Sequence, residues 1–300
     1  MKYDLISILG CTATGKTRLA VQLAEHFNGE IISADSRQVY RGMNIGTGKD
    51  LNEYFINGKS IPFHLIDVID PKSEFNLYSF QNLFYKAFNE IKGRDKLPFL
   101  VGGTGLYLSS ILQNYTLNKA DFENKKKQFS SFSDNELKEM LLNINPNLHN
   151  TTDLKDRGRI IKAIAVSKAQ NSIKGKQKIE SLTIGVNLSR DEIKKRITAR
   201  LKKRLDEEGM IDEVKSLMGS GISYDKMIFF GLEYKFIAQY LKGELSKNDM
   251  FQKLNSAIHS FAKRQMTWFR KMEKEGVNIH WINGPNFNNV KELIERNLVY

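Results

Sequence analysis

A glycine-rich segment near the N-terminus constrains this chain more than any other feature. Residues 10–17 fit the pattern G-x-x-x-x-G-K-[ST]. An apolar run that predicts a strand over Leu5–Leu9 comes before the segment, and a predicted helix over Lys16–His26 begins within it. The N–H groups of such a loop and of the helix N-terminus converge on an anion. The motif predicts a phosphate site of the kind found in nucleotide-binding and ATP-binding proteins, with Thr17 as a Mg²⁺ ligand. Its residues are Gly10, Cys11, Thr12, Ala13, Thr14, Gly15, Lys16 and Thr17.

Strand and helix patterns alternate through the first third of the chain. Further short apolar runs predict strands over Glu30–Ala34, His64–Ile69 and Leu97–Val101. Between them, Tyr78–Lys92 carries apolar residues at helical spacing. This alternation predicts an α/β fold in which a parallel sheet is covered by helices on both faces.

A polar helical stretch interrupts this pattern from about residue 119. It contains predicted helices over Asp134–Asn143 and Asp153–Ala169, before a strand pattern returns at Leu182–Leu188. The remaining predicted elements are the helices Arg190–Gly219, Phe229–Leu241 and Ser246–Glu275 and the strand Asn278–Ile282. We predict a core formed by residues 1–118 and 181–300, and a helical insertion formed by residues 119–180.

Positive charge is concentrated in the middle of the chain. The sequence has 46 Lys and Arg against 34 Asp and Glu, a net charge of +12. Residues 119–205 hold 21 basic and 10 acidic residues, a net +11, whereas residues 1–118 carry +1 and residues 206–300 carry zero. Such a segment is typical of a surface that faces a polyanion, although a solvated helical face gives the same pattern. With one cysteine and no apolar run of about 18 residues, we expect a cytoplasmic protein without disulfides or membrane segments. We also expect a monomer.

Asp35 ends the second predicted strand and is the first candidate for acid–base chemistry. Because carboxyl ends of parallel strands line the ligand crevice, Asp35 should face the phosphate loop. From its position alone, a helix-capping role is the more common one for an aspartate that follows a strand. The strand Leu97–Val101 runs into Gly-Gly-Thr-Gly without a carboxylate, which argues against an ATPase that holds Mg²⁺ at that point.

Several segments together resemble the tRNA dimethylallyltransferases, also called tRNA isopentenyltransferases. They include the phosphate loop, Asp-Ser-Arg-Gln-Val-Tyr at 35–40, Gly-Gly-Thr-Gly-Leu-Tyr at 102–107 and Ala-Lys-Arg-Gln-Met-Thr-Trp-Phe-Arg at 262–270. The resemblance implies a P-loop kinase-like core with a helical insertion that clamps the anticodon arm of tRNA. It also implies transfer of a dimethylallyl group from dimethylallyl diphosphate to the N6 amine of the adenine that follows the anticodon. In this family the phosphate loop holds the diphosphate of the donor, and Mg²⁺ is the cofactor.

The resemblance also assigns roles to individual residues. Asp35 matches the general base on N6, and Thr104 matches a threonine at the reactive channel. The implied tRNA-binding residues are Asp35, Ser36, Arg37, Gln38, Lys125, Gly158, Arg159, Ile160, Ile161, Lys162, Lys263 and Arg264. Glu233 stands where the family usually has glycine, so no contact is carried over for that segment.

Two other functions stay open from the sequence. An ATP-dependent kinase explains the phosphate loop but not the +11 segment, and a non-catalytic RNA-binding module explains the charge but not Asp35. An enzyme that prenylates free adenine nucleotides needs no basic clamp. Outside these motifs, Trp268 and His64 are expected to be structural, because no second His or Cys lies at metal-binding spacing from His64.

Overall fold

The computed structural model describes residues 3–117, 127–144, 154, 156–168 and 178–298 of the 300-residue chain. These form two compact units, one of Met1–Gln113 with Ile179–Tyr300 and one of Asn114–Lys178. The second unit therefore begins and ends within a few residues of the helical insertion that we place at 119–180. No helix among the described residues is long and apolar enough to cross a membrane.

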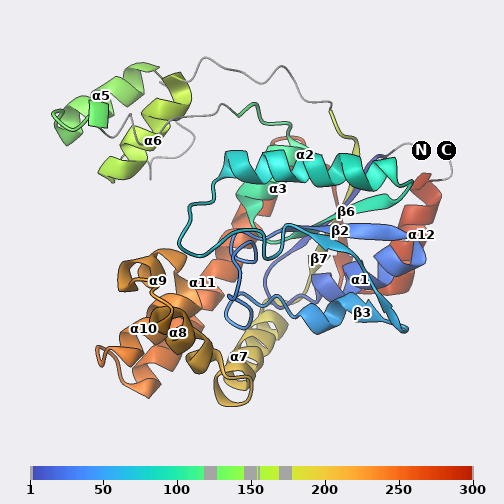
Figure 1. The fold of residues 1–300 in the computed structure, drawn as a ribbon. Coiled ribbons are helices and arrows are strands. Elements are labelled where there is room, and N and C mark those ends of the chain that lie inside the picture. Colours follow the sequence, from blue (N-terminus) through green and yellow to red (C-terminus); the bar gives the residue numbers. More distant parts are fainter. Residues whose placement is uncertain (1–2, 118–126, 145–153, 155, 169–177, 299–300) are drawn as a thin grey trace. The chain divides into compact units, whose positions relative to one another are not determined.

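A six-stranded sheet with parallel neighbours forms the centre of the first unit (Figure 1). The predicted α/β fold with a parallel sheet is confirmed. Because the strands run the same way, their carboxyl ends meet at one edge of the sheet. In spatial order the strands are β5 (Phe63–His64), β2 (Gly29–Ala34), β6 (Leu97–Gly102), β1 (Leu5–Gly10), β7 (Ser181–Asn187) and β8 (Ile279–Asn283).

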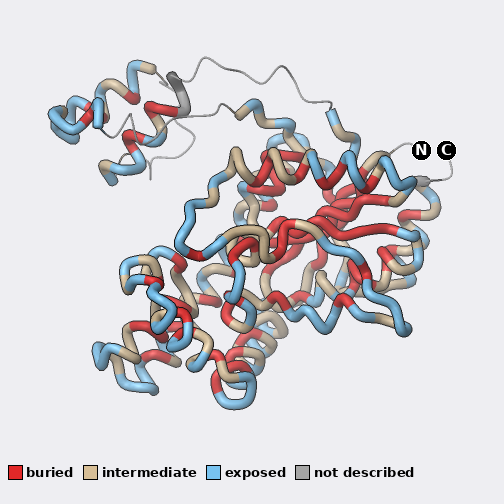
Figure 2. The backbone as a smooth tube through the Cα atoms, viewed as in Figure 1, coloured by how far each residue is buried: buried red, intermediate tan, exposed pale blue. Residues whose placement is uncertain are grey.

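Two apolar clusters cover the two faces of this sheet. Alternate residues of β1 divide between them: Leu5 and Leu9 belong to one cluster, and Ile6 and Ile8 to the other. Burial on both faces explains why the strands read as nearly continuous apolar runs, and Figure 2 shows them buried. The Ile6 side of the sheet is covered by α1 (Lys16–His26) and α12 (Phe287–Leu298), and the Leu5 side by α2 (Leu77–Gly93) and α3 (Gly105–Leu112).

The C-terminal helices are shorter and more numerous than the sequence predicts. The predicted helix Arg190–Gly219 is wrong as one element, because Gly209 adopts a left-handed φ of 78° and divides it. The predicted helix Phe229–Leu241 is likewise divided at Gly231, which has a φ of 74°. The observed helices are α7 (Arg190–Asp206), α8 (Met210–Gly219), α9 (Tyr224–Phe230), α10 (Leu232–Leu241) and α11 (Lys247–Lys274).

The predicted strand His64–Ile69 is also wrong over most of its length. Only β5, at Phe63–His64, joins the sheet, because Leu65 and Asp67 adopt left-handed φ values of 64° and 55°. A short hairpin and a helical turn precede it. These are η1 (Leu51–Tyr54), β3 (Phe55–Ile56) and β4 (Lys59–Ser60).

His64 has the structural role expected from the sequence. Its Nε2 lies 2.8 Å from an oxygen of Glu30, whose other contact is Arg94, with Nη2 at 2.7 Å. Burial tends to raise the pKa of the Glu30 carboxyl, but the hydrogen bonds from Arg94 and His64 hold it below its ordinary value.

The second unit has a small apolar core of its own. Two helices of this unit have bounds within the described residues, α5 (Asp134–Ile144) and α6 (Arg157–Lys168), and they pack through buried residues such as Leu137 and Ile164. Arg157 donates to the carbonyl oxygens of Phe129 and Phe132, at 2.9 and 2.7 Å. The helix predicted over Asp134–Asn143 is confirmed, whereas both predicted ends of Asp153–Ala169 lie outside the described residues.

Candidate active site

A cavity of about 380 Å³ lies where β1, β2 and β6 end. Most of the site residues predicted for the core contribute to it. The predicted residues in its wall are Thr12, Lys16, Thr17, Asp35, Ser36, Arg37, Gln38, Thr104 and Arg264. The cavity is also lined by residues to which the sequence analysis gave no role in the site. These are Asp50, Arg200, Arg204, Glu233, Tyr234 and Gln265.

The phosphate loop has the backbone geometry of an anion site. Gly15 adopts a left-handed φ of 83° at the N-cap of α1, and no side chain caps the helix there. The first N–H groups of α1 are therefore available to a ligand. Gly10 has no room for a side chain, since an added Cβ would lie 2.9 Å from the carbonyl oxygen of Val186. The loop is closed by Thr14, whose hydroxyl donates to the Cys11 carbonyl at 2.9 Å.

Two cations without ion-pair partners among the described residues face this loop. Lys16 donates to the Cys11 carbonyl at 3.4 Å, and burial lowers the pKa of Lys16 although the charge of Asp35 counteracts it. Arg200, from α7, donates to the Thr12 hydroxyl. Burial, with a smaller contribution from a neighbouring arginine, lowers the pKa of Arg200 to about 10. Desolvated, unpaired positive charge of this kind is stabilised when an anion binds.

Asp35 lines the same cavity as Lys16. Its Oδ1 accepts from the N–H of Arg37 at 2.8 Å and of Gln38 at 3.4 Å, so one oxygen closes the turn at residues 36–39. No helix begins at this turn, so the helix-capping alternative is wrong. Its Oδ2 receives no hydrogen bond from a described residue and can accept a proton. Thr104 fixes the adjacent backbone, because its hydroxyl accepts from the Ser36 N–H at 3.0 Å.

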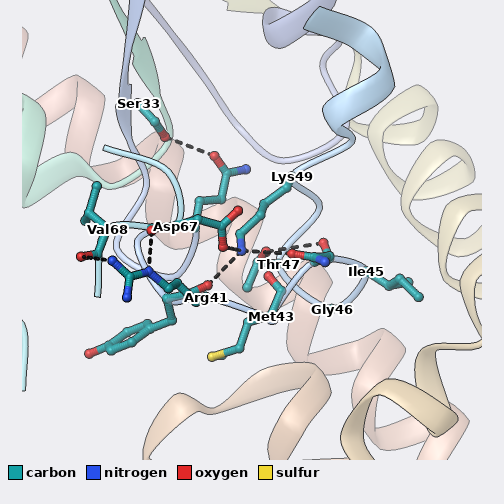
Figure 3. Close-up of polar contacts among 12 residues, drawn as sticks. Ser33, Arg41, Met43, Ile45, Gly46, Thr47, Lys49, Asp67 and Val68 are labelled. Atoms are coloured by element: carbon teal, nitrogen blue, oxygen red, sulfur yellow. Dashed lines mark hydrogen bonds and ion pairs between the residues drawn. The ribbon is translucent and has the colours of Figure 1, made fainter. Parts of the chain in front are cut away.

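A buried lysine, Lys49, holds the loop that follows Asp35. Lys49 is fully buried, and its ammonium donates to the Tyr40 carbonyl at 2.7 Å and to Asn44 Oδ1 at 3.0 Å. It also pairs with Asp67, as Figure 3 shows. Gln38 closes the loop with a bond from its Nε2 to the Gly48 carbonyl at 3.0 Å.

Helices α8 and α10 also hold this loop, through a single carboxylate. Glu213, on α8, accepts from the N–H groups of Asn44, Ile45 and Gly46 at 2.8, 2.7 and 3.0 Å. The same carboxylate accepts from the Tyr234 hydroxyl at 2.8 Å. One carboxylate therefore fixes three successive N–H groups of the loop against α8 and α10.

Helix α11 supports the phosphate loop through Gln265. This buried side chain accepts from the Thr12 N–H at 2.9 Å and donates to the Gly103 carbonyl at 2.9 Å. Trp268 is structural, as expected, since its indole donates to Ser109 at 2.8 Å. Of the predicted basic pair on α11, Arg264 lines the same cavity as Lys16 and Asp35, whereas Lys263 lines a separate cavity of about 750 Å³.

Glu233 lies in the cavity wall beside the arginines of α7. Burial raises the pKa of its carboxyl, while the charges of Arg204 and Arg200 oppose that rise. Arg204 already has a partner in Asp50, with Nη2 at 3.0 Å from Oδ1. The Glu233 charge therefore reduces the attraction of this wall for an anion.

The predicted tRNA-binding residues of the second unit divide into two groups. Gly158, Arg159 and Lys162 are exposed, whereas Ile160 and Ile161 are buried in the core of that unit. The two isoleucines can therefore affect RNA binding only by holding α6 in place. Lys125, the remaining predicted residue, lies outside the described residues.

A signal for the two missed arginines was present in the sequence. Arg200 and Arg204 are four residues apart, on the helix face that also carries the buried Ile197 and Leu201. Charged residues on the apolar face of an amphipathic helix are rarely buried without a function or a partner. Lys49 and Gln265 gave no such signal. Lys49 bonds mainly to residues of its own irregular loop, and the partners of Gln265 lie more than 160 positions away in the sequence.

Comparison with known proteins identifies the family of this chain. The IPP transferase family matches residues 38–272, and the isopentenyl transferase family matches residues 3–62. A protein named tRNA dimethylallyltransferase 1 from Geotalea uraniireducens is 50% identical over 304 residues, covering 100% of this chain and 99% of that protein. The chain belongs to the tRNA dimethylallyltransferase family.

Solved structures of this family have the same fold. The full-length tRNA isopentenylpyrophosphate transferase from Bacillus halodurans superposes with a TM-score of 0.69 at 33% identity, covering 99% of this chain and 95% of that one. A eukaryotic dimethylallyltransferase, described as acting on tRNA, shares the fold with a TM-score of 0.76 at 23% identity, covering 98% of this chain and 77% of that one.

Proposed function

We propose that this protein transfers the dimethylallyl group of dimethylallyl diphosphate to the N6 amine of the adenine that follows the anticodon in tRNA. The observation that carries the proposal is that one cavity holds both the unpaired cations of the phosphate loop and the available carboxylate oxygen of Asp35. In the reaction, N6 attacks the allylic C1, the C1–O bond breaks, and diphosphate leaves with the bonding electrons. The amine nitrogen then loses its proton.

The phosphate loop stabilises the leaving group. Negative charge grows on the diphosphate as the C1–O bond breaks, and the N–H groups at the start of α1 point to it. Lys16 and Arg200 place positive charge at the same end of the cavity. Because these groups are already positioned and partly desolvated, they stabilise that charge without reorganising.

The residues present fit a Mg²⁺ ion that binds together with the donor. Thr17 lines the cavity, and no cluster of three or more His, Cys, Asp or Glu side chains suited to a metal occurs among the described residues. Mg²⁺ commonly uses substrate phosphates and water with one or two protein ligands rather than a dedicated cage. Held by the Thr17 hydroxyl and the diphosphate, it would supply further charge neutralisation.

Asp35 accepts the proton that N6 loses. The amine is a poor nucleophile because its lone pair is delocalised into the purine ring, so removal of the proton favours the alkylated product. General-base assistance of this kind contributes about 10²–10⁴-fold in rate. The adenine must leave its stack to reach the cavity, at a cost of a few kcal/mol that is smaller in a loop than in a duplex.

Basic residues of the second unit and of α11 offset that cost through contacts with RNA phosphates. In the second unit these are Arg159 and Lys162, exposed three residues apart on α6, together with Lys125. On α11, Lys263 and Arg264 are exposed as well. We propose that the protein acts as a monomer in the cytoplasm, where its tRNA substrates are found.

The proposal is tested with purified protein, dimethylallyl diphosphate, Mg²⁺ and unmodified tRNA, followed by mass spectrometry of the nucleosides. We expect a dimethylallyl-adenosine and an equal amount of diphosphate. A parallel assay supplies ATP and a small acceptor; production of ADP there, with no prenylated tRNA in the first assay, would replace the proposal with a kinase. Tight tRNA binding without turnover of the donor would replace it with an RNA-binding module.

A further inference from the structure

Phe229 is an exposed aromatic side chain next to two residues of the cavity wall, Arg37 and Phe230. It is 54% exposed at the end of α9, while the next residue, Phe230, is only 3% exposed and lines the cavity. The Phe230 ring packs edge-on against Tyr40 and Tyr234, with centroid distances of 5.0 and 5.9 Å. Packing of Phe230 therefore fixes the end of α9, and Phe229 is presented to solvent next to the cavity wall.

Two cations lie close to the Phe229 ring. The guanidinium carbon of Arg37 is 5.1 Å from the ring centroid, and the ammonium of Lys226 is 5.2 Å from it. Arg37 also donates to the Phe229 carbonyl at 3.0 Å, which ties the loop after β2 to α9. The Lys226 ammonium is held by the Ser73 carbonyl at 3.0 Å.

Arg37 has no ion-pair partner among the described residues. Its guanidinium is half-buried, lines the cavity and has one hydrogen bond to a neutral carbonyl. Burial lowers the pKa of Arg37, so its charge is incompletely compensated in the free protein. A phosphate at this position would supply the missing negative charge in a bidentate geometry.

We propose that Phe229 and Arg37 form a subsite for the unpaired nucleotide next to the adenine in the cavity. The base of that nucleotide stacks on the Phe229 ring, and its phosphate binds the Arg37 guanidinium. RNA is the occupant that combines a flat π surface with an adjacent negative charge, which an exposed aromatic ring flanked by cations recognises. The inference rests on the proposed function, because it names a subsite for the same RNA substrate.

The location of the subsite gives it a role in extruding the target base. Phe229 is adjacent in sequence to the cavity-lining Phe230. The neighbouring base loses its stacking contact with the target adenine when the adenine leaves the loop, and stacking of that base on Phe229 replaces this contact. A contact made with the RNA but not with the donor lowers the KM for tRNA and leaves donor binding unchanged.

The test compares Phe229→Ala with Phe229→Trp, Phe229→Leu and the control Phe55→Ala. Phe55 is 63% exposed on β3 in the same unit and does not line the cavity. For each variant, the KM for unmodified tRNA, the kcat at saturating tRNA and the Kd for inorganic diphosphate are measured. Exposure of both phenylalanines means that the substitutions leave the core intact, which thermal unfolding verifies.

Loss of one stacked base predicts a rise of roughly 5- to 100-fold in the KM for tRNA with Phe229→Ala. We expect Phe229→Trp to restore the KM, Phe229→Leu to restore little, and Phe55→Ala and diphosphate binding to stay at wild-type values. A wild-type KM in Phe229→Ala, or full restoration by leucine, would overturn the subsite while prenylation by the wild-type protein upheld the proposed function. Absence of prenylation by the wild-type protein would reject the proposed function, and equal tRNA Kd values for wild type and Phe229→Ala would then reject the subsite separately.

Discussion

Arg200→Met is expected to stabilise the free protein while impairing its binding of diphosphate. Burial of the guanidinium among other cations lowers the pKa of Arg200 from 12.5 to about 10. At 1.36 kcal/mol for each pKa unit, this fall of about 2.5 corresponds to about 3 kcal/mol of unfavourable free energy in the folded state. The substitution removes that penalty and forfeits the hydrogen bond to Thr12, worth about 2 kcal/mol because its donor is charged.

The net effect is a rise of about 1 kcal/mol in the free energy of unfolding, seen as a Tm higher by about 2 °C. Diphosphate should bind roughly 10- to 100-fold more weakly, because a charge-assisted contact is lost. The matched control is Arg196→Met, one turn earlier on α7, where the arginine pairs on the surface with Glu192 at 2.6 Å. That variant should change the unfolding free energy by less than about 0.5 kcal/mol and leave diphosphate binding intact.

Urea unfolding and calorimetric titration of inorganic diphosphate measure both quantities for each variant. A lower unfolding free energy in Arg200→Met together with a wild-type Kd would refute the reasoning. It would mean that Arg200 is held for structural reasons and does not contact the diphosphate.

Four further results are expected. Lys49→Met should lower the free energy of unfolding by about 3–5 kcal/mol in urea titrations, because it leaves the partners of a buried ammonium unpaired. Glu30 has a pKa below its ordinary 4.5, so its charge stabilises the fold above that pH, and this contribution disappears as pH falls through the lower folded-state value. Urea unfolding from pH 6 to 3 should therefore show a steeper acid loss in the wild type than in Glu30→Gln. Removing charge with Glu233→Gln should tighten inorganic diphosphate binding several-fold at pH 7.5, and weaker binding would show that Glu233 assists the anion. Arg159→Ala and Lys162→Ala should each weaken tRNA binding and reduce its salt dependence by about one phosphate contact, whereas unchanged affinity and slope would remove α6 from the RNA interface.

Local patterns predicted the sheet and the phosphate loop because both depend on short segments. The helix predicted over Lys16–His26 has those bounds in the structure, and the apolar run Leu5–Leu9 lies within β1. Asp35 could be placed at the cavity because parallel strands end at a common edge. These inferences needed only periodicity, a motif and one topological rule.

The remaining errors and omissions come from longer-range packing and from backbone torsions. Nothing in the helical periodicity of residues 190–219 fixes the left-handed torsion of Gly209, which divides that segment. The apolar character of residues 64–69 predicted a strand, but left-handed torsions at Leu65 and Asp67 end the strand, and Asp67 pairs with Lys49 instead. Arg200 meets Thr12 across 188 positions of sequence, and this contact exists only in the folded protein.

The central claim is that Asp35, beside the phosphate loop, is the base that takes the proton from N6, and the turnover of Asp35→Asn tests it most directly. Asparagine keeps an oxygen that can accept from the Arg37 N–H, so the local turn is preserved, but its amide cannot take the proton from N6. Single-turnover prenylation should fall by about 10²–10⁴-fold, with the Kd values for tRNA and diphosphate within about threefold of the wild type. Turnover near the wild-type rate would contradict the assignment of Asp35 as the base.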